Sequence, residues 1–166
     1  MSKPQIQQFF DLVSEFSSEN GDSPAEIKQL LKIMPPNAVS RDGDTALHIL
    51  ASNNEWELAE MIIEKKASVD IRDSRKNTPL HIATSECQQE MVDVLIKARA
   101  NVAARDGENF TPLMIAVSFD HLEILDILLK GKANPNDVDK ILPFGPTLVQ
   151  FLQLSLLTLF LTLHPL

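Results

Sequence analysis

The side chains best suited to chemistry in this sequence are two histidines and one cysteine. His48 and His81 lie 33 residues apart in nearly identical surroundings, so they could form a metal-binding pair. Cys87 could act as a nucleophile, but no basic residue in its own segment would activate its thiol. Two histidines and an unactivated cysteine are a weak basis for either a metal centre or a catalytic site.

No established catalytic or cofactor motif accompanies these residues. The sequence contains no GxGxxG, P-loop, HExxH, CxxC or nucleophile elbow. Asn109-Phe110-Thr111 spells a glycosylation acceptor, which matters only in a secreted protein. We therefore expect no enzymatic activity, no cofactor and no metal.

Composition and charge narrow the class of protein further. The chain has 166 residues and a formal net charge of −8, which disfavours nucleic-acid binding because that requires clustered Lys and Arg. A single cysteine cannot form an internal disulfide, and the N-terminus lacks the continuous apolar core of a secretory signal. We expect a cytoplasmic protein, with a nuclear location also open.

The histidines belong to a repeat of 33 residues. The segment Thr78-Pro79-Leu80-His81-Ile82 has one counterpart starting at Thr45 and another starting at Thr111, and threonine, leucine and isoleucine keep their places in all three. Several identical columns in constant register are far more specific than one short motif. Two more columns have the same spacing: Ala67, Ala100 and Ala133, and Asp73, Asp106 and Asp139.

Each copy is predicted to form two helices. Pro79 lacks a backbone N–H and has a φ near helical values, so it marks a first turn, with Thr78 as the N-cap. Residues 90–97 carry apolar side chains at three- and four-residue spacing, which predicts a second helix. The polar segments 68–77 and 101–110 connect one pair to the next. One pair is too small to bury both apolar faces, so the pairs must stack.

These residues resemble the ankyrin-repeat family, whose repeat is a β-turn finger followed by two antiparallel helices with a T-P-L-H-x-A start. The resemblance implies an all-α fold, an ankyrin-repeat α-solenoid of helix pairs with β-turn fingers. It covers three full copies at residues 41–73, 74–106 and 107–139. It also implies a structural task for His48 and His81, because the imidazole in this family braces the finger by hydrogen bonds.

The chain departs from the family pattern at three turns of each repeat where glycine is expected. Glycine there permits φ > 0, which asparagine tolerates and lysine tolerates poorly. We therefore expect an array that is less regular and less stable than a consensus one. Of the nine positions only one, Gly43, keeps the glycine. The three columns are Lys66, Arg99 and Lys132; Gly43, Lys76 and Asn109; and Asn54, Cys87 and Asp120.

Residues 1–40 are predicted to form two helices that act as a degenerate N-terminal capping repeat. The first covers residues 5–17, which include Phe9 and Phe10. The second follows the capping-box pattern of Ser23-Pro24-Ala25-Glu26 and ends at two consecutive prolines.

Residues 140–166 form an apolar tail that carries no charge from Ile141 to Leu166. Three interpretations remain open for it. The tail could be a membrane anchor, although residues 147–163 barely reach the roughly 17–25 apolar residues that a span needs and contain polar side chains. It could be a helix that covers the last repeat as an irregular cap. It could also be a divergent or non-native ending that the array does not use.

The resemblance implies that the protein binds a partner protein on a concave face made by finger tips and inner helices. Phe110 and Phe119 are candidate anchors because exposed aromatic side chains often dominate binding energy; alternatively they pack on each other or under the tail. Trp56 is expected to pack on the convex side. The basic run Arg72, Arg75 and Lys76 on one finger is usually solvated but could receive an acidic partner segment. The predicted partner-binding residues are Arg41, Asp44, Ser52, Asn53, Arg75, Asn77, Ser85, Glu86, Glu108, Phe110, Ser118 and Phe119.

Two narrower hypotheses follow. The opening from Arg41 to His48 is similar to the first repeat of the inhibitors of NF-κB/Rel transcription factors, which implies sequestration of a Rel dimer. A short chain without long regulatory ends also resembles the viral, vankyrin-type relatives of those inhibitors. The tail instead allows a membrane-tethered adaptor, with membrane contact through residues 141–166. We expect a monomer in either case.

Overall fold

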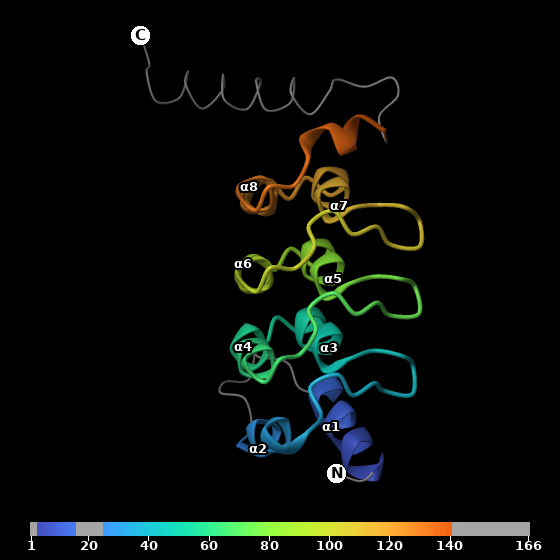
Figure 1. Ribbon diagram of the computed structural model, residues 1–166, viewed down its shortest axis with the longest axis vertical. Helices are drawn as coiled ribbons and strands as arrows, with labels where there is room; N and C mark the ends of the chain where they lie inside the picture. Colours follow the sequence, from blue (N-terminus) through green and yellow to red (C-terminus); the bar gives the residue numbers. More distant parts are fainter. Residues whose placement is uncertain (1–2, 16–24, 141–166) are drawn as a thin grey trace.

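The computed structural model describes residues 3–15 and 25–140, and this part of the chain contains eight α-helices followed by a short 3-10 helix. The helices stack in two columns, with α1, α3, α5 and α7 in one and α2, α4, α6 and α8 in the other (Figure 1). The predicted all-α solenoid of helix pairs is confirmed. In chain order the elements are α1 (Lys3–Glu15), α2 (Ala25–Ile33), α3 (Ala46–Ser52), α4 (Trp56–Glu64), α5 (Pro79–Ser85), α6 (Gln89–Lys97), α7 (Pro112–Ser118), α8 (Leu122–Lys130) and η2 (Pro135–Lys140).

One hydrophobic core runs along the stack. The inner helix α3 contacts α5, and α5 contacts α7, while the outer helices α4, α6 and α8 contact one another in the same order. Leu47, Leu80 and Leu113 occupy one column of this core, and none is more than 1 % exposed. The 33-residue repeat therefore places equivalent side chains in successive layers, and each pair buries its apolar surface only against its neighbours.

The inner helices begin where the threonine and proline pattern predicts. Pro79 and Pro112 lie in the first turns of α5 and α7, and Thr78 and Thr111 occupy the N-cap positions. A capping box closes the start of α3, α5 and α7 alike, and the hydroxyl of Thr111 accepts a hydrogen bond from the backbone N–H of Met114 at 3.3 Å. Proline opens these short helices because the first turn has no partner for the N–H that proline lacks.

The three departures from glycine all fall on left-handed backbone. Within the described residues, positive φ occurs only in the three columns where the family pattern has glycine. These residues are Lys66, Arg99 and Lys132; Gly43, Lys76 and Asn109; and Asn54, Cys87 and Asp120. The non-glycine members have φ between 57° and 73°, and Gly43 has φ of 93°. This conformation destabilises a residue with a Cβ atom by about 1 kcal/mol, and it destabilises asparagine less. The turns thus keep the geometry of a glycine-rich repeat without most of its glycines.

The N-terminal helices form a pair that packs under the first full repeat. The side chains of Phe9, Phe10, Ile27 and Leu31 are buried in the common core. Helix α1 begins two residues before the predicted range. The predicted capping residues Ser23 and Pro24 lie outside the described part of the chain.

Lys65, just after α4, ties this pair to the array. Its ammonium group donates to the carbonyl oxygens of Leu31, Lys32 and Met34 at 2.8, 2.9 and 2.8 Å. The last carbonyls of a helix have no partner within the helix, and a cation at that end also complements the helix dipole. Lys65 therefore caps the end of α2 from the next repeat.

The tail on which the three interpretations rest, residues 141–166, lies outside the described residues. Between residues 3 and 140, in the ranges that the structure describes, every helix is too short or too polar to span a bilayer.

Replacing Cys87 with glycine should raise the free energy of unfolding by about 0.5–1 kcal/mol, because glycine adopts φ near 58° without Cβ strain. Asn54→Gly should gain less, since asparagine already tolerates this backbone. Urea denaturation of the full chain measures both. As a control, Glu60→Gly in the exposed interior of α4 should cost about 1 kcal/mol. If Cys87→Gly lowered the free energy of unfolding as much as Glu60→Gly does, the strain argument would be contradicted.

Candidate binding surface

One side-chain acceptor organises the start of each finger. The Oδ1 atom of Asp73 accepts hydrogen bonds from the backbone N–H groups of Arg75 at 2.8 Å and Asn77 at 2.7 Å. Asp106 makes the equivalent bonds in the next finger at 2.9 and 2.8 Å, and the Oγ atom of Ser40 makes them in the first finger at 3.2 Å each. The sequence pattern revealed the aspartates but missed Ser40, whose hydroxyl supplies the same acceptor.

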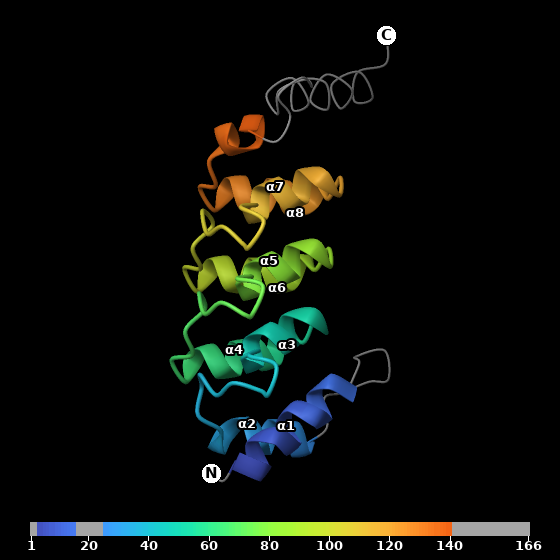
Figure 2. The ribbon, with the colours of Figure 1, turned by 90° about the vertical axis from the view of Figure 1, so that its right-hand side faces the viewer.

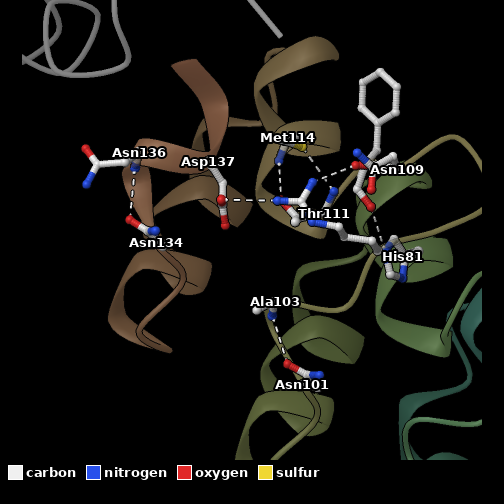
Figure 3. Close-up of polar contacts among 11 residues, drawn as sticks. His81, Asn101, Ala103, Asn109, Thr111, Met114, Asn134, Asn136 and Asp137 are labelled. Carbon is white, nitrogen blue, oxygen red and sulfur yellow. Dashed lines mark hydrogen bonds and ion pairs between the residues drawn. The ribbon is translucent and has the colours of Figure 1, made fainter. Parts of the chain in front are cut away.

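The two histidines join each inner helix to the next finger. The Nδ1 atom of His48 accepts from the backbone N–H of Thr45 at 3.1 Å, so the ring proton lies on Nε2, which donates to the carbonyl of Asn77 at 3.1 Å. His81 repeats this arrangement and donates to the carbonyl of Phe110 at 3.2 Å (Figure 3). Both imidazoles are 1 % exposed. The structural task that the family resemblance implied for them is confirmed.

Burial lowers the pKa of His81 below its usual value of 6.5, because the imidazolium ion would lose its hydration. The carbonyl of Phe110 and the carboxylate of Asp106 act in the opposite direction without cancelling this effect. The neutral form is also the one that the hydrogen bonds require, since Nδ1 must accept. Within residues 3–15 and 25–140, no three His, Cys, Asp or Glu side chains are grouped to hold a metal ion.

The third repeat ends the histidine series. Met114 takes the histidine position, and the backbone N–H of Thr111 donates to its sulfur at 3.2 Å. A thioether has no proton to donate onward. Instead, Arg105 donates to the carbonyl of Asn109 at 2.8 Å and forms an ion pair with Asp137 of η2 at 3.2 Å (Figure 3).

Neighbouring fingers also contact each other directly. The backbone N–H of Gly107 donates to the carbonyl of Arg75 at 2.9 Å, and a Cβ atom on residue 107 would lie 2.6 Å from that oxygen. The guanidinium group of Arg72 donates to the carbonyl of Arg105. All three residues of the basic run on this finger are exposed, and Arg72 also bonds within the array.

A second set of side chains caps the ends of the inner helices. Gln88 donates to the carbonyl of Ser52 at 3.0 Å, and Nδ1 of His121 donates to that of Thr84 at 2.9 Å. The amide of Asn53 makes a similar bond to α1 at 2.7 Å. Each cap comes from one repeat and acts on the repeat before it, so the inner helices cannot slide past one another freely.

The predicted partner-binding residues lie on the fingers and at the ends of α3, α5 and α7, and we call them the finger/inner-helix face. The fingers project from the same side of these helices (Figure 1). Arg41, Ser52, Arg75, Ser85, Glu86, Glu108, Ser118 and Phe119 are exposed, whereas Asp44, Asn53, Asn77 and Phe110 are partly buried.

Some members of this face already have structural partners. The side-chain amide of Asn77 donates to Asp73 at 3.1 Å, and its carbonyl accepts from His48. Asn53 is used in helix capping, and the hydroxyl of Ser118 donates to the carbonyl of Met114 at 2.9 Å. These residues shape the face, and the fully exposed members are better placed to meet a partner.

The two aromatic candidates differ in their surroundings. The side chain of Phe119 is 62 % exposed, and its ring stacks on His121 with centroids 5.8 Å apart and planes at 23°. Phe110 is partly buried, and among the described residues its ring does not pair with that of Phe119. The alternative that these two rings pack on each other is therefore wrong.

Sequence reasoning missed an apolar stripe on the same helices. Ile49 and Ile82 are partly exposed although they pack against the core, and Ile115 is 9 % exposed. Each lies one turn before an exposed serine of the face. The isoleucine column was visible as a repeat marker, but spacing alone could not show that Ile49 and Ile82 are partly exposed while Ile115 is buried. Trp56 is partly buried at the start of the outer helix α4, as its predicted packing role requires.

The stacked pairs and the row of fingers define a helical repeat solenoid that presents an extended surface. Ankyrin repeats in three copies match residues 15–106, and a further ankyrin repeat matches residues 108–140. The chain belongs to the ankyrin-repeat family. Such repeats indicate a protein–protein interaction module, and members of this family are generally non-enzymatic scaffolds. A search of curated proteins found no match to the chain.

Replacing His81 with methionine, the residue that the chain uses at position 114, should make stability less dependent on pH. Because the pKa of His81 is lower in the folded chain than the unfolded value near 6.5, its contribution is complete above pH 6.5 and decreases as pH falls below it. We expect the wild type to be more stable than His81→Met by about 1 kcal/mol at pH 7, with a smaller gap at pH 5. Urea denaturation at both values measures the gap, and a gap that widens on acidification would contradict the assignment.

Replacing Gly107 with alanine should lower the free energy of unfolding by about 1–2 kcal/mol, because the new Cβ would clash with the carbonyl of Arg75. Ser74 holds the corresponding position one repeat earlier and is exposed. Ser74→Ala is therefore the matched control and should change stability by less than about 0.5 kcal/mol. Thermal denaturation followed by circular dichroism compares the two, and equal stabilities would disprove the close contact between fingers.

Proposed function

We propose that the finger/inner-helix face binds a partner protein and that Phe119 is its central anchor. The observation that carries this proposal is the exposure of Phe119, which at 62 % exceeds that of every other large apolar side chain in the described ranges. A phenyl ring left in water is unfavourable, and aromatic side chains of this kind commonly dominate the energetics of interfaces.

The surroundings of Phe119 suit an interface with a polar rim. Ser85 and Glu86 are exposed at the end of α5, and Ser118 is exposed beside the ring. Interfaces typically combine an apolar centre with hydrogen-bonding groups around it. A partner with an apolar pocket flanked by hydrogen-bond donors would match this arrangement, since Glu86 offers a carboxylate and the serines offer hydroxyl groups.

The bonds between repeats support a preorganised face. His48 and His81 hold the second and third fingers to the inner helices, and the N–H of Gly107 fixes one finger against another. A surface already held in its binding conformation loses little entropy on association. The buried bonds thus favour affinity without contacting the partner.

Replacing Phe119 with alanine should weaken partner binding by about tenfold or more, because an anchor aromatic typically contributes at least 1–2 kcal/mol. The first measurement is site-specific photo-crosslinking from position 86 in the full chain, followed by identification of the captured protein and titration of that protein. Position 60 on the outer helix α4 is the control site for crosslinking.

Ile33→Ala is the matched control for affinity, since this residue is 58 % exposed but lies outside the face. A partner that crosslinks from position 60 and not from position 86, or whose affinity is unaffected by Phe119→Ala, would contradict the proposal.

A second candidate is an inhibitor of NF-κB/Rel transcription factors. The segment from Arg41 to His48 favours it, because its DGDTxLH pattern is similar to the first repeat of those inhibitors. Titration of a purified Rel dimer with the full chain tests this role. Binding that is lost on changing Phe110 and Phe119 to alanine would support it, and absence of binding at micromolar concentrations would exclude it.

A third candidate, a membrane-tethered adaptor, is favoured only by the charge-free run of residues 141–166. Fractionation of cells that express the full chain, beside a version that ends at Lys140, tests it. Carbonate-resistant membrane association of the full chain alone would support an anchor, and equal solubility of both chains would exclude one.

A further inference from the structure

A row of basic residues follows the outer helices. Lys66, Arg99 and Lys132 each lie two residues after the end of an outer helix, at 33-residue spacing, and we call them the basic ridge. The chain leaves α4, α6 and α8 along one edge of the array (Figure 2). None of the three residues belongs to the finger/inner-helix face.

The charges of the basic ridge are available to a ligand. All three side chains are exposed, and none forms an ion pair or hydrogen bond with another described residue. Nearby cations differ, because Lys97 and Lys130 are paired with carboxylates one turn earlier in their own helices. The ridge is thus a line of unpaired cations on a chain with a net charge of −8.

The backbone does not explain why these positions are basic. All three have positive φ, between 66° and 69°, where glycine would avoid the strain of a Cβ. The other two left-handed columns each contain a residue that suits this backbone, glycine or asparagine. Only the column of the ridge has neither glycine nor asparagine, so all three of its residues carry the steric strain of a Cβ on left-handed backbone.

The helix dipole does not explain the column either. A cation near the C-terminus of a helix is favourable, and this applies to inner and outer helices alike. The equivalent turns after the inner helices carry Asn54, Cys87 and Asp120, with no cation and one opposite charge. Of the two columns of turns that follow helices, only the one after the outer helices is basic in every repeat.

We propose that the basic ridge binds an acidic helical segment of a partner protein. Packed helices lie about 8–10 Å apart, so the three cations recur at about that interval along the stack of α4, α6 and α8. Carboxylates spaced seven residues apart on one face of a helix recur at about 10.5 Å. The two periods match, and three charge pairs can form along one line.

The overall charge favours a short protein segment over a larger polyanion. A nucleic acid or an anionic membrane is large, so it would be repelled by the other charges of a chain with net charge −8 while the ridge attracts it. A single acidic helix contacts the ridge alone, and at physiological salt more distant charges are largely screened beyond about 8 Å. The ridge therefore selects for a narrow ligand with charge on one face.

The test uses the full chain and a fluorescent 21-residue helical peptide with glutamate at every seventh position. Fluorescence anisotropy at physiological salt should show binding that weakens as more salt is added, because the contacts are between exposed charges. The combined variant Lys66→Gly, Arg99→Gly and Lys132→Gly should bind about tenfold more weakly. It should also unfold at a higher urea concentration, which separates loss of binding from loss of fold.

A matched variant, with Asn54, Cys87 and Asp120 all changed to glycine, relieves the same backbone strain and keeps the ridge. It should bind the peptide at least as tightly as the wild type. A set of glutamine substitutions at the ridge provides the same loss of charge if the glycine variant folds poorly. Unchanged binding in both ridge variants would overturn the proposal.

Two further comparisons test the ligand class. A peptide with the same composition but glutamates five residues apart should bind more weakly, and equal binding would overturn the match of periods. Phosphatidylserine vesicles and single-stranded RNA should bind no more tightly than the helical peptide. Tighter binding of either one that depends on the ridge would replace the proposed partner with a membrane or a nucleic acid.

Discussion

The structure depends on one constraint: a helix pair with apolar side chains on two sides is unstable until a neighbour covers each side. Leu47 and Leu80 are buried because each of their layers lies between two other helix pairs, and the layer of Leu113 contacts the preceding pair and η2. Stacking also buries polar backbone groups near the fingers, and each such group left without a partner would cost about 1–3 kcal/mol. The hydrogen bonds of His48 and His81 satisfy some of these groups, so they are a consequence of stacking as well as a support for it.

The first and the last of the described layers use different polar contacts from the layers between them. At the N-terminal end, Lys65 reaches back to cap α2 with a charged group. Toward the other end, Met114 stops the histidine series and Arg105 forms an ion pair with Asp137 instead. One core pattern thus runs through the described layers, while the polar contacts change at the first and the last of them.

Surface residues are free of this constraint, which makes them the informative part of the chain for binding. Phe119 and the basic ridge both depart from what solvation or backbone geometry alone would favour. The first exposes an aromatic ring, and the second places Lys66 and its equivalents on left-handed backbone. The two features lie in different columns of the repeat and differ in chemistry, so they define separate surfaces, one suited to apolar contact and one to charge pairing.

The sequence by itself determined the repeat, the helix pairs and the left-handed turns, because these depend on local spacing, capping and glycine-like positions. It did not separate the exposed members of the face from the partly buried ones, because equivalent columns differ in exposure: Asn53 is partly buried, whereas Glu86 and Phe119 are exposed. The tertiary structure alone decided the tasks of Lys65, Gly107 and Arg72, whose partners are contributed by other repeats. Contacts between residues that are 31 to 37 positions apart depend on how the layers are rotated and spaced, and no local pattern encodes that geometry.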